Sequence, residues 1–502
     1  MEIGQKQTGK SISKNVFYGF LTWFLPLGLS FAATPLIVRT LGDADYGIYA
    51  LVLGFIGYSF TFSIGRAITK YIAEYRANGE TDKIRDVISA TFFVNIAVGL
   101  LGVTAICLSA NWLVRELFKI TPEAQSKTVL AMYIAALVIF CTMLNQVFNA
   151  VLQGIHRFDV YAKILNASNF AMLFGNIVLV LRGYGLLFLL VWNLLITLTT
   201  SIVFAVAAKR LLPEFGINLR FRRETLKLVM RYSSGIIGYQ ILANLLLLFE
   251  RGWITRQLGS ESLTYYVVPM SLGMYIHGFI SSLMLVIFPL ASELKNEKEK
   301  LLRLYLNATK IACLLVVFLV TTLIIGSNSF LTIYMGASFA EKSSALLIIH
   351  AVTFGTLAIL TVSWQMTEGL GYPNYNFYVF GICLVVSVTL MLLLTKNYGN
   401  FGVAIARLFG FGTLFFSIFY VEKWFFKKIQ IEFWAKIIGN LGIAAIFAGL
   451  SEFFIIKNLD LNWFTFILSV VCGGIVYLFA LWILDFVTAD EKILIKKILS
   501  RS

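Results

Sequence analysis

The chain has 502 residues, of which 59% are hydrophobic and only 13% are charged. A soluble protein of this length would need far more charge to cover its surface. The composition therefore excludes an ordinary soluble enzyme and predicts that the lipid bilayer is the solvent. The five cysteines all lie inside apolar runs, without a CxxC motif or a Cys/His cluster, so we expect neither disulfides nor a structural zinc site.

Apolar runs long enough to cross about 30 Å of hydrocarbon recur along the whole chain. The first run, from about Asn15 to Arg39, is too long for the core of a secretory signal, so we interpret it as a retained first span. Proline interrupts the first and eighth runs and marks candidate flexible points, because it removes a backbone hydrogen bond. About fourteen transmembrane helices are predicted: 15–39, 47–69, 87–109, 128–152, 160–181, 186–208, 232–255, 264–290, 307–326, 343–366, 375–395, 401–421, 434–455 and 463–486.

The distribution of positive charge sets the predicted orientation. With the N-terminus inside, the inner loops and adjoining helix ends hold 30 lysines and arginines and the outer ones hold 10, with Arg407 left within a span. Cytoplasmic loops are enriched in Lys and Arg, so an even number of spans with both termini in the cytoplasm is favoured. Topology then accounts for most of the net charge of +15, and we expect no nucleic-acid partner. No connection is long enough for a separate catalytic domain.

A faint internal duplication divides the chain. The stretch VRTLGDADYGIYAL at 38–51 has a copy, TRQLGSESLTYYVV, at 255–268, in which an arginine, a Leu-Gly pair and a tyrosine recur. Two further pairs of matches, after spans four and ten and after spans five and eleven, keep nearly the same offset. Six spans per copy is an even number, so a parallel pseudo-two-fold axis along the membrane normal would relate the copies. We predict an all-α fold with two six-helix lobes, 1–215 and 216–425, followed by two accessory helices and a cytoplasmic tail, 426–502.

The Asp43-Ala-Asp45 segment in the first copy admits two interpretations. Carboxylates bind divalent metals, so a D-x-D motif is typical of a metal site in a membrane glycosyltransferase. However, this short loop has no room for a sugar donor, and the second copy replaces both aspartates with Ser260 and Ser262. Asp and Ser are also turn-forming residues, which favours a tight turn between two helices, with Arg39 as the residue of chemical interest.

Polar residues at bilayer depth are costly and are therefore candidates for function. Stripes of Ser, Asn and Gln at helical spacing run along spans two, four, five and seven. The embedded charge is mainly cationic, and arginine matches phosphate oxygens in pairs, which favours a phosphate-bearing substrate over a cation. Glu250, one of few acids within a span, is the candidate for ion coupling. The candidate substrate-binding residues are Arg39, Arg66, Lys70, Asn145, Asn149, Gln240, Asn244, Arg251, Arg256 and Arg407, and no catalytic or metal-binding residue is predicted.

These candidates also have purely structural interpretations. Asn and Ser stripes can form interhelical hydrogen bonds, and the lysine of span two can extend to the inner interface. Glu250 and Arg251 can neutralise each other, while Arg39 and Arg256 can anchor helix ends at the outer interface. His277 could relay protons, although packing is the simpler role for a histidine within a span.

Four stretches resemble the polysaccharide-transport branch, of the O-antigen flippase type, of the multidrug/oligosaccharidyl-lipid/polysaccharide exporter superfamily. They are PLIVRTLGDADYGIYAL at 35–51, GRAITKYIAEY from Gly65, QGIHRFDVY from Gln153 and LFERGWITRQLG from Leu248. The likeness covers roughly residues 10–425. It implies two six-helix lobes around a basic central cavity. By alternating access, these lobes would move an undecaprenyl-diphosphate-linked oligosaccharide from the inner to the outer leaflet of a prokaryotic cytoplasmic membrane.

The resemblance also implies cycling that is coupled to H+ or Na+ or driven by the substrate gradient, with no other cofactor. Related lipid II flippases place arginines in the first two cavity helices, and Arg39 and Arg66 are the matching positions, although span one has no second, deeper arginine. The expected partners are the polyprenyl-diphosphate-linked glycan, membrane lipids, and a polymerase and glycosyltransferases that act on the same glycan. The alternatives are a cation-coupled small-molecule or drug antiporter of the same superfamily and, less favoured, a membrane glycosyltransferase or polymerase.

Overall fold

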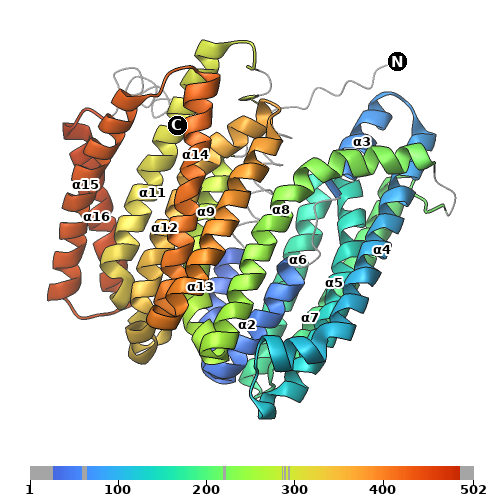
Figure 1. The fold of residues 1–502 in the computed structure, drawn as a ribbon, viewed down its shortest axis with the longest axis horizontal. Helices are drawn as coiled ribbons and strands as arrows, with labels where there is room; N and C mark the ends of the chain where they lie inside the picture. The colour runs from blue at the N-terminus through green and yellow to red at the C-terminus, as the bar shows by residue number, and fades with distance from the viewer. Residues whose placement is uncertain are drawn as a thin grey trace. The chain divides into compact units, whose positions relative to one another are not determined.

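A computed structural model describes residues 26–58, 65–155, 157–218, 222–284, 287, 290–291 and 294–486 of the chain. Within these ranges the regular secondary structure consists of helices, with no strand (Figure 1). Contacts divide the chain into two compact units, Met1–Thr264 and Tyr265–Ser502, which are described separately below.

The first unit contains eight described α-helices and one short π-helix. Its centre is α5 (Pro122–Gly154), which packs against α2, α3, α4 and α7. Buried aliphatic and aromatic side chains from these helices, among them Ile84, Val151 and Phe204, form one core. The elements are the helix Pro26–Leu41, α2 (Asp43–Tyr58), α3 (Gly65–Ala77), α4 (Thr81–Trp112), η1 (Leu113–Leu117), α5, α6 (Phe158–Leu181), α7 (Leu186–Leu211) and α8 (Arg223–Leu258).

The last helix of this unit, α8, packs against α2, α3 and α4. The compact unit therefore extends well beyond residue 215, where the first copy of the sequence repeat was expected to end. A repeat boundary and a packing boundary need not coincide, because one helix can be the first of its copy and still bury its apolar face against the other copy. The division into lobes at 1–215, 216–425 and 426–502 stays a prediction.

The second unit is built around α11 (Lys298–Met335) and α12 (Ala337–Gly369), which pack along each other. The opposite side of α11 packs against α15 and α16, which lie side by side in Figure 1. Cys313, Leu441 and Tyr477 belong to the core that joins these three helices. The remaining elements are α9 (Ser260–Met284) from Tyr265 on, α13 (Pro373–Gly412), η2 (Thr413–Phe415), α14 (Phe416–Phe419), η3 (Tyr420–Phe425), α15 (Ile431–Asn458) and α16 (Trp463–Ile483).

A sharp turn inside α13 separates two of the predicted spans. A continuous helix over the apolar stretch Asn374–Phe425 would be about 78 Å long at 1.5 Å per residue, far more than one membrane crossing requires. At Gly399, however, the backbone leaves the helical region, with φ 54° and ψ −137°. Beyond it the chain folds back, since a Cβ on Gly402 would lie 2.6 Å from the carbonyl oxygen of Leu394. The Tyr375 hydroxyl likewise donates to the carbonyl of Phe416 at 2.7 Å, so the two arms are antiparallel.

The buried carboxylate of Glu422 ties the accessory helices to this unit. Glu422 lies in η3 and is 0% exposed. One of its oxygens accepts hydrogen bonds from the Tyr305 hydroxyl of α11 (3.0 Å) and the Trp434 indole of α15 (2.7 Å). The other oxygen accepts from the backbone N–H of Gln430 (2.8 Å). Three donors satisfy the buried carboxylate and fix α15 against α11.

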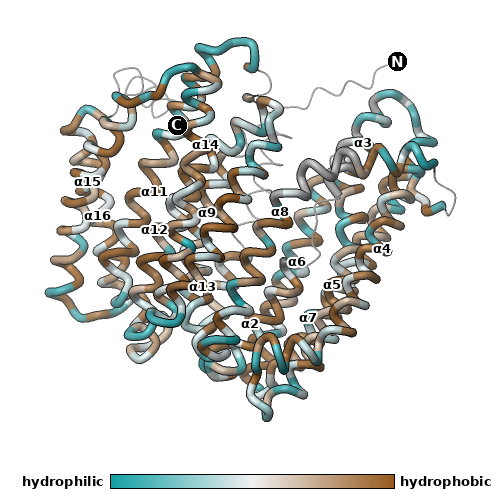
Figure 2. Tube along the Cα trace, viewed as in Figure 1, coloured by the Kyte–Doolittle hydropathy of each residue, from teal (hydrophilic) through white to brown (hydrophobic). Residues whose placement is uncertain are grey.

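The hydropathy of the helices matches a membrane-spanning protein. Ten helices among the described residues are long and apolar enough to cross a bilayer, with Pro26–Leu41 as a shorter apolar helix. Figure 2 shows apolar residues along the helices and hydrophilic residues gathered at the loops and helix ends. Large apolar side chains on α15 and α16, such as Phe454 at 70% and Phe464 at 74%, are exposed, as expected for surfaces that face lipid. The prediction of an all-α polytopic membrane protein is confirmed, while the count of fourteen spans stays a prediction.

Candidate functional site

The two copies of the Leu-Gly sequence form the same local turn. Gly42 and Gly259 have φ values of +79° and +87°, and a helix begins at the next residue in each case. The N–H of each glycine donates to the carbonyl four residues earlier, Val38 for Gly42 and Thr255 for Gly259. A positive φ at the end of a helix favours glycine, which explains why this residue recurs in both copies.

The aspartates after the first turn belong to the start of α2. Both carboxylate oxygens of Asp45 lie 2.6 Å from the Lys127 ammonium group in the first turns of α5. Asp43 contributes its backbone carbonyl, which accepts a hydrogen bond from the Thr264 hydroxyl. Acidic residues are also favoured in the first turn of a helix by its dipole. These contacts support the interpretation of this segment as a turn.

The arginines that precede the two turns differ in their surroundings. Arg39, at the end of the helix Pro26–Leu41, is exposed. Arg256, at the end of α8, donates from one guanidinium nitrogen to the carbonyls of Glu116 (2.7 Å) and Leu117 (3.2 Å). These carbonyls lie at the C-terminal end of η1, where a cation is favoured. Arg256 therefore holds the end of η1 against α8.

Arg251 and Glu250 occupy the interior of the first unit. Arg251 is 7% exposed, and its guanidinium donates a hydrogen bond to the carbonyl of Ala50 on α2. Its stem crosses α2 at Gly54, where a Cβ would lie only 2.7 Å from the Arg251 Cδ. Glu250 is 0% exposed. Arg251 thus lies at the contact between α2 and α8. Both residues are within a helix, as the sequence analysis predicted for these two charged candidates.

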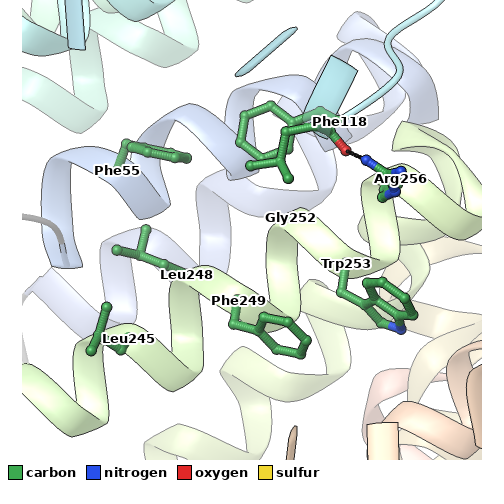
Figure 3. A pocket seen from close by; sticks show the side chains of 9 residues that line it. Phe55, Phe118, Leu245, Leu248, Phe249, Gly252, Trp253 and Arg256 are labelled. Atoms are coloured by element: carbon green, nitrogen blue, oxygen red, sulfur yellow. Dashed lines mark hydrogen bonds between the residues drawn. The ribbon is translucent and has the colours of Figure 1, made fainter. Parts of the chain in front are cut away.

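A cavity of about 440 Å³ lies within the first unit beside this contact. Figure 3 shows Phe55 and Phe118 on one side of it and residues of α8 on the other, with Arg256 near one end. The Phe249 and Trp253 rings stack, with centroids 5.8 Å apart and an interplanar angle of 11°. The remaining lining residues are Leu117, Leu245, Leu248 and Gly252.

Gly252 allows the cavity wall to close. A side chain there would place its Cβ 2.9 Å from the Phe118 ring, so only glycine lets the phenyl group approach α8 this closely. Phe118 in turn packs edge to face on Phe55 at 5.8 Å. The wall is thus aromatic and aliphatic, and among the described residues that line the cavity Arg256 is the one with a charge.

The four candidate amides are not among the described residues that line the cavity. Asn145 and Asn149 on α5, and Gln240 and Asn244 on α8, are half-buried. The side-chain carbonyl of Asn145 is buried and accepts no hydrogen bond from the described residues. The side-chain carbonyls of Gln146 and Asn166 share this property, so it does not by itself separate a binding amide from a structural one.

A second polar group joins three helices of the first unit. The hydroxyl of Tyr49 on α2 accepts a hydrogen bond from Asn193 on α7 at 3.2 Å, and it also interacts with Asn176 on α6. All three residues are at most 5% exposed. Tyr49 is the tyrosine that recurs in the second copy as Tyr266, which packs edge to face on His350 at 4.7 Å. The repeated tyrosine is therefore a buried contact residue in both units.

The remaining candidates, Arg66, Lys70 and Arg407, do not line this cavity in the described structure. Arg66 and Lys70 lie on α3, but their side chains are outside the described residues. Arg407 lies in the second unit, is 1% exposed, and stands over the rings of Phe354 (5.7 Å) and Phe411 (5.4 Å). It contacts aromatic faces here rather than open water, a cation–π arrangement that compensates part of its desolvation.

His277 forms a small hydroxyl cluster in the second unit. Its Nε2 lies 3.0 Å from the Ser281 hydroxyl and 3.4 Å from that of Thr361 on α12. These contacts fit the packing interpretation, since they satisfy the ring between two helices. The proton-relay role stays a prediction.

Sequence reasoning found the arginines but missed the aromatic wall. Phe249 and Trp253 are four residues apart on α8, so their spacing could have indicated one face. Phe55 and Phe118 come from distant segments and carry no such signal. In the described part of the site, Arg256 thus lies beside an apolar, partly aromatic surface.

Comparison with known proteins agrees with this arrangement. Residues 36–344 match the profile of a family described as polysaccharide biosynthesis protein. A protein of Shigella flexneri, named as a candidate O-antigen transporter, is 22% identical over 408 residues, covering 79% of this chain and 94% of its own. An uncharacterized membrane protein of Methanocaldococcus jannaschii is 24% identical over 496 residues, with 94% of each chain covered.

Solved structures show the same fold. The lipid II flippase MurJ, in an inward closed conformation, superposes with a TM-score of 0.69 at 15% identity, covering 93% of this chain and 97% of its own. A multidrug resistance MATE family transporter, in an inward-facing conformation, superposes with a TM-score of 0.61 at 17% identity, covering 80% and 93% of the two chains. Both of these proteins are named for transport.

Proposed function

This chain belongs to the polysaccharide biosynthesis protein family of membrane transporters, and from that premise we propose that it flips a polyprenyl-diphosphate-linked oligosaccharide. The movement would run from the inner to the outer leaflet of a prokaryotic cytoplasmic membrane, with both termini in the cytoplasm. The transporters similar to it in sequence or fold support a flippase or exporter and not an enzyme.

The observation that carries the proposal is the cavity that combines Arg256 with an aromatic wall. A diphosphate cannot enter hydrocarbon without a large desolvation cost, whereas the polyprenyl chain can stay in an apolar environment throughout. Arginine supplies paired donors for phosphate oxygens, and the Phe249–Trp253 face supplies apolar contact for the adjoining chain. Binding need not be tight, because the substrate must also leave.

Alternating access of two lobes is the proposed mechanism, with coupling to H+ or Na+. Glu250 is the candidate for the coupling site, since it is a fully buried acid beside Arg251. Arg39, Arg66, Lys70, Arg407 and the amides Asn145, Asn149, Gln240 and Asn244 complete the proposed substrate path. A polymerase and glycosyltransferases that act on the same glycan are the proposed partners.

The direct test is a strain that lacks the gene and any paralogue. We expect lipid-linked oligosaccharide to accumulate on the inner leaflet and surface glycan to disappear, with both restored by the wild-type gene. Normal surface glycan in this strain would reject the proposal. An Arg66→Ala variant expressed in this strain should insert into the membrane normally but fail to restore export. Full export by this variant would remove Arg66 from the substrate path.

A cation-coupled drug antiporter is the second candidate, favoured by the MATE-like fold. Overexpression followed by drug-susceptibility measurements distinguishes the two. Increased resistance to structurally unrelated cations, together with normal surface glycan in the deletion strain, would favour the antiporter.

A further inference from the structure

Two buried carboxyl groups of the second unit have very different surroundings. Glu422 accepts hydrogen bonds from three donors, the Tyr305 hydroxyl, the Trp434 indole and the backbone N–H of Gln430. Glu452 on α15 is also buried, at 1% exposure, but its only side-chain hydrogen bond with a described residue is from the Thr322 hydroxyl of α11, at 2.8 Å. This difference suggests different tasks for two acids on neighbouring segments.

Within the described part of the chain, Glu452 forms no ion pair. On the helices packed against it, α11 has no charged residue after Lys310, and α16 has none at all. The other titratable groups on these two helices, beyond Lys310, are Cys313, Tyr334, Cys472 and Tyr477. The Tyr477 hydroxyl donates to the carbonyl of Leu314 and not to Glu452.

Glu452 lies deep within the bilayer. Its Cγ and Oε1 would be 2.5 Å from a Cβ on Gly473, which is the middle residue of the 21-residue helix α16. An ionised carboxylate at this depth, with one hydroxyl as partner, would cost several kcal/mol. The neutral acid avoids this cost, so the group gains a proton in this arrangement.

The contact between α11 and α15 is not continuous. An apolar hollow of about 370 Å³ lies between them, lined by Thr321, Ile325, Gly449 and Phe453 among others. Thr321 adjoins Thr322, and Phe453 adjoins Glu452. The approach of α11 and α15 depends on a small residue, because a Cβ on Gly449 would lie 3.3 Å from Ile325. A modest separation of these helices would therefore expose the carboxyl group.

We propose that Glu452 is a proton-binding site of the accessory helices α15 and α16. As α11 and α15 close, its carboxylate takes one proton from water to form the neutral acid that the closed arrangement buries. When α11 and α15 separate, the acid releases that proton to water, so no other reactant is consumed. The role in export rests on the proposed function, in which a cation gradient drives the cycle, whereas the protonation itself does not.

The first test is infrared difference spectroscopy of the purified full-length protein in lipid vesicles at neutral pH. Wild type should show a carbonyl band of a protonated carboxylic acid, which shifts in heavy water. Glu452→Gln should lack this band, and Glu422→Gln should retain it. A band that persists in Glu452→Gln, or a wild-type spectrum without one, would overturn the proposal.

The second test measures transport of lipid-linked glycan by the same proteins, with and without a pH gradient across the vesicle. Glu452→Gln should lose the stimulation by the gradient but keep exchange at equal pH, because glutamine preserves shape and hydrogen bonding. Unchanged stimulation would refute the coupling role. Thr322→Val, which removes the partner but keeps the acid, should retain the infrared band. If wild type moves no glycan at all, the proposed function fails, and the infrared result still decides the proton site.

Discussion

The guanidinium of Arg251 donates a hydrogen bond to the backbone carbonyl of Ala50, and its stem passes over Gly54 on the same helix. One side chain of α8 thereby fixes the separation of α8 from α2. This arrangement needs a residue without a side chain at position 54, since any larger residue competes with the arginine for the same space.

Substitution of Gly54 should therefore loosen this contact. Gly54→Leu inserts methyl groups against the Arg251 stem, and overpacking of this kind costs about 1–3 kcal/mol. We expect a lower midpoint of thermal unfolding in detergent. Gly57→Leu is the matched control on the same helix, because a Cβ there meets nothing within 4 Å. Equal stability of the two variants would contradict the role assigned to Arg251.

Arg256 should matter for transport more than for insertion. Loss of a charge-assisted contact costs about 1.5–3 kcal/mol, so Arg256→Ala should reduce the rate of glycan transport at least about tenfold. Arg256→Lys should restore part of the rate, since lysine keeps the charge without the paired donors. The exposed Arg182, at the end of α6, provides the control. A normal rate in Arg256→Ala, measured in vesicles at equal protein content, would remove this residue from the site.

The contact between Asp45 and Lys127 should contribute only modestly to stability. Both side chains are about one-third exposed, and pairs of this kind are worth about 0–1 kcal/mol. Asp45→Asn should therefore lower the unfolding midpoint slightly and leave export intact. The exchange Asp45→Lys with Lys127→Asp should recover the midpoint. Complete loss of export in Asp45→Asn would instead favour a metal site at this segment.

Two glycines of α13, Gly399 and Gly412, should respond to alanine with opposite changes in stability. At Gly399, φ is 54° and ψ is −137°, a conformation that side chains disfavour, so Gly399→Ala should destabilise by about 1–3 kcal/mol. At Gly412 the backbone is helical and a Cβ meets nothing within 4 Å, so Gly412→Ala should stabilise by about 0.5–1 kcal/mol. Unfolding midpoints of both variants check this. An unchanged unfolding midpoint in Gly399→Ala would show that the turn does not require glycine at this position.

Much of the fold could be predicted from the sequence because bilayer thickness sets helix length. The apolar runs at 128–152 and 463–486, for example, correspond to α5 and α16 within a few residues. The turn shared by Gly42 and Gly259 was also predictable, because positive φ favours a specific residue. The turn at Gly399 also falls where the sequence predicted a break, between the spans 375–395 and 401–421.

The candidate site was harder to predict for a physical reason. Charged residues stand out in an apolar sequence, so Arg251 and Arg256 could be identified singly. An aromatic wall cannot be identified from the sequence in this way. Phenylalanine is common throughout this chain, and only the tertiary fold brings Phe55 and Phe118 together. Likewise, the sequence shows that Glu452 is an acid in a span but not that Thr322 is its only partner.

The clamp formed by Tyr305, Glu422 and Trp434 has a mechanical consequence. It joins α15 to the end of α11, while Glu452 and Thr322 join the same two helices at mid-membrane. The Glu422 contacts hold one end of α15 against α11, so the two helices can separate only at the level of Glu452 and Thr322, with the Glu422 end as the hinge. A shift of the lipid-facing helices α15 and α16 in response to bilayer thickness would then act directly on the hydrogen bond between Thr322 and Glu452.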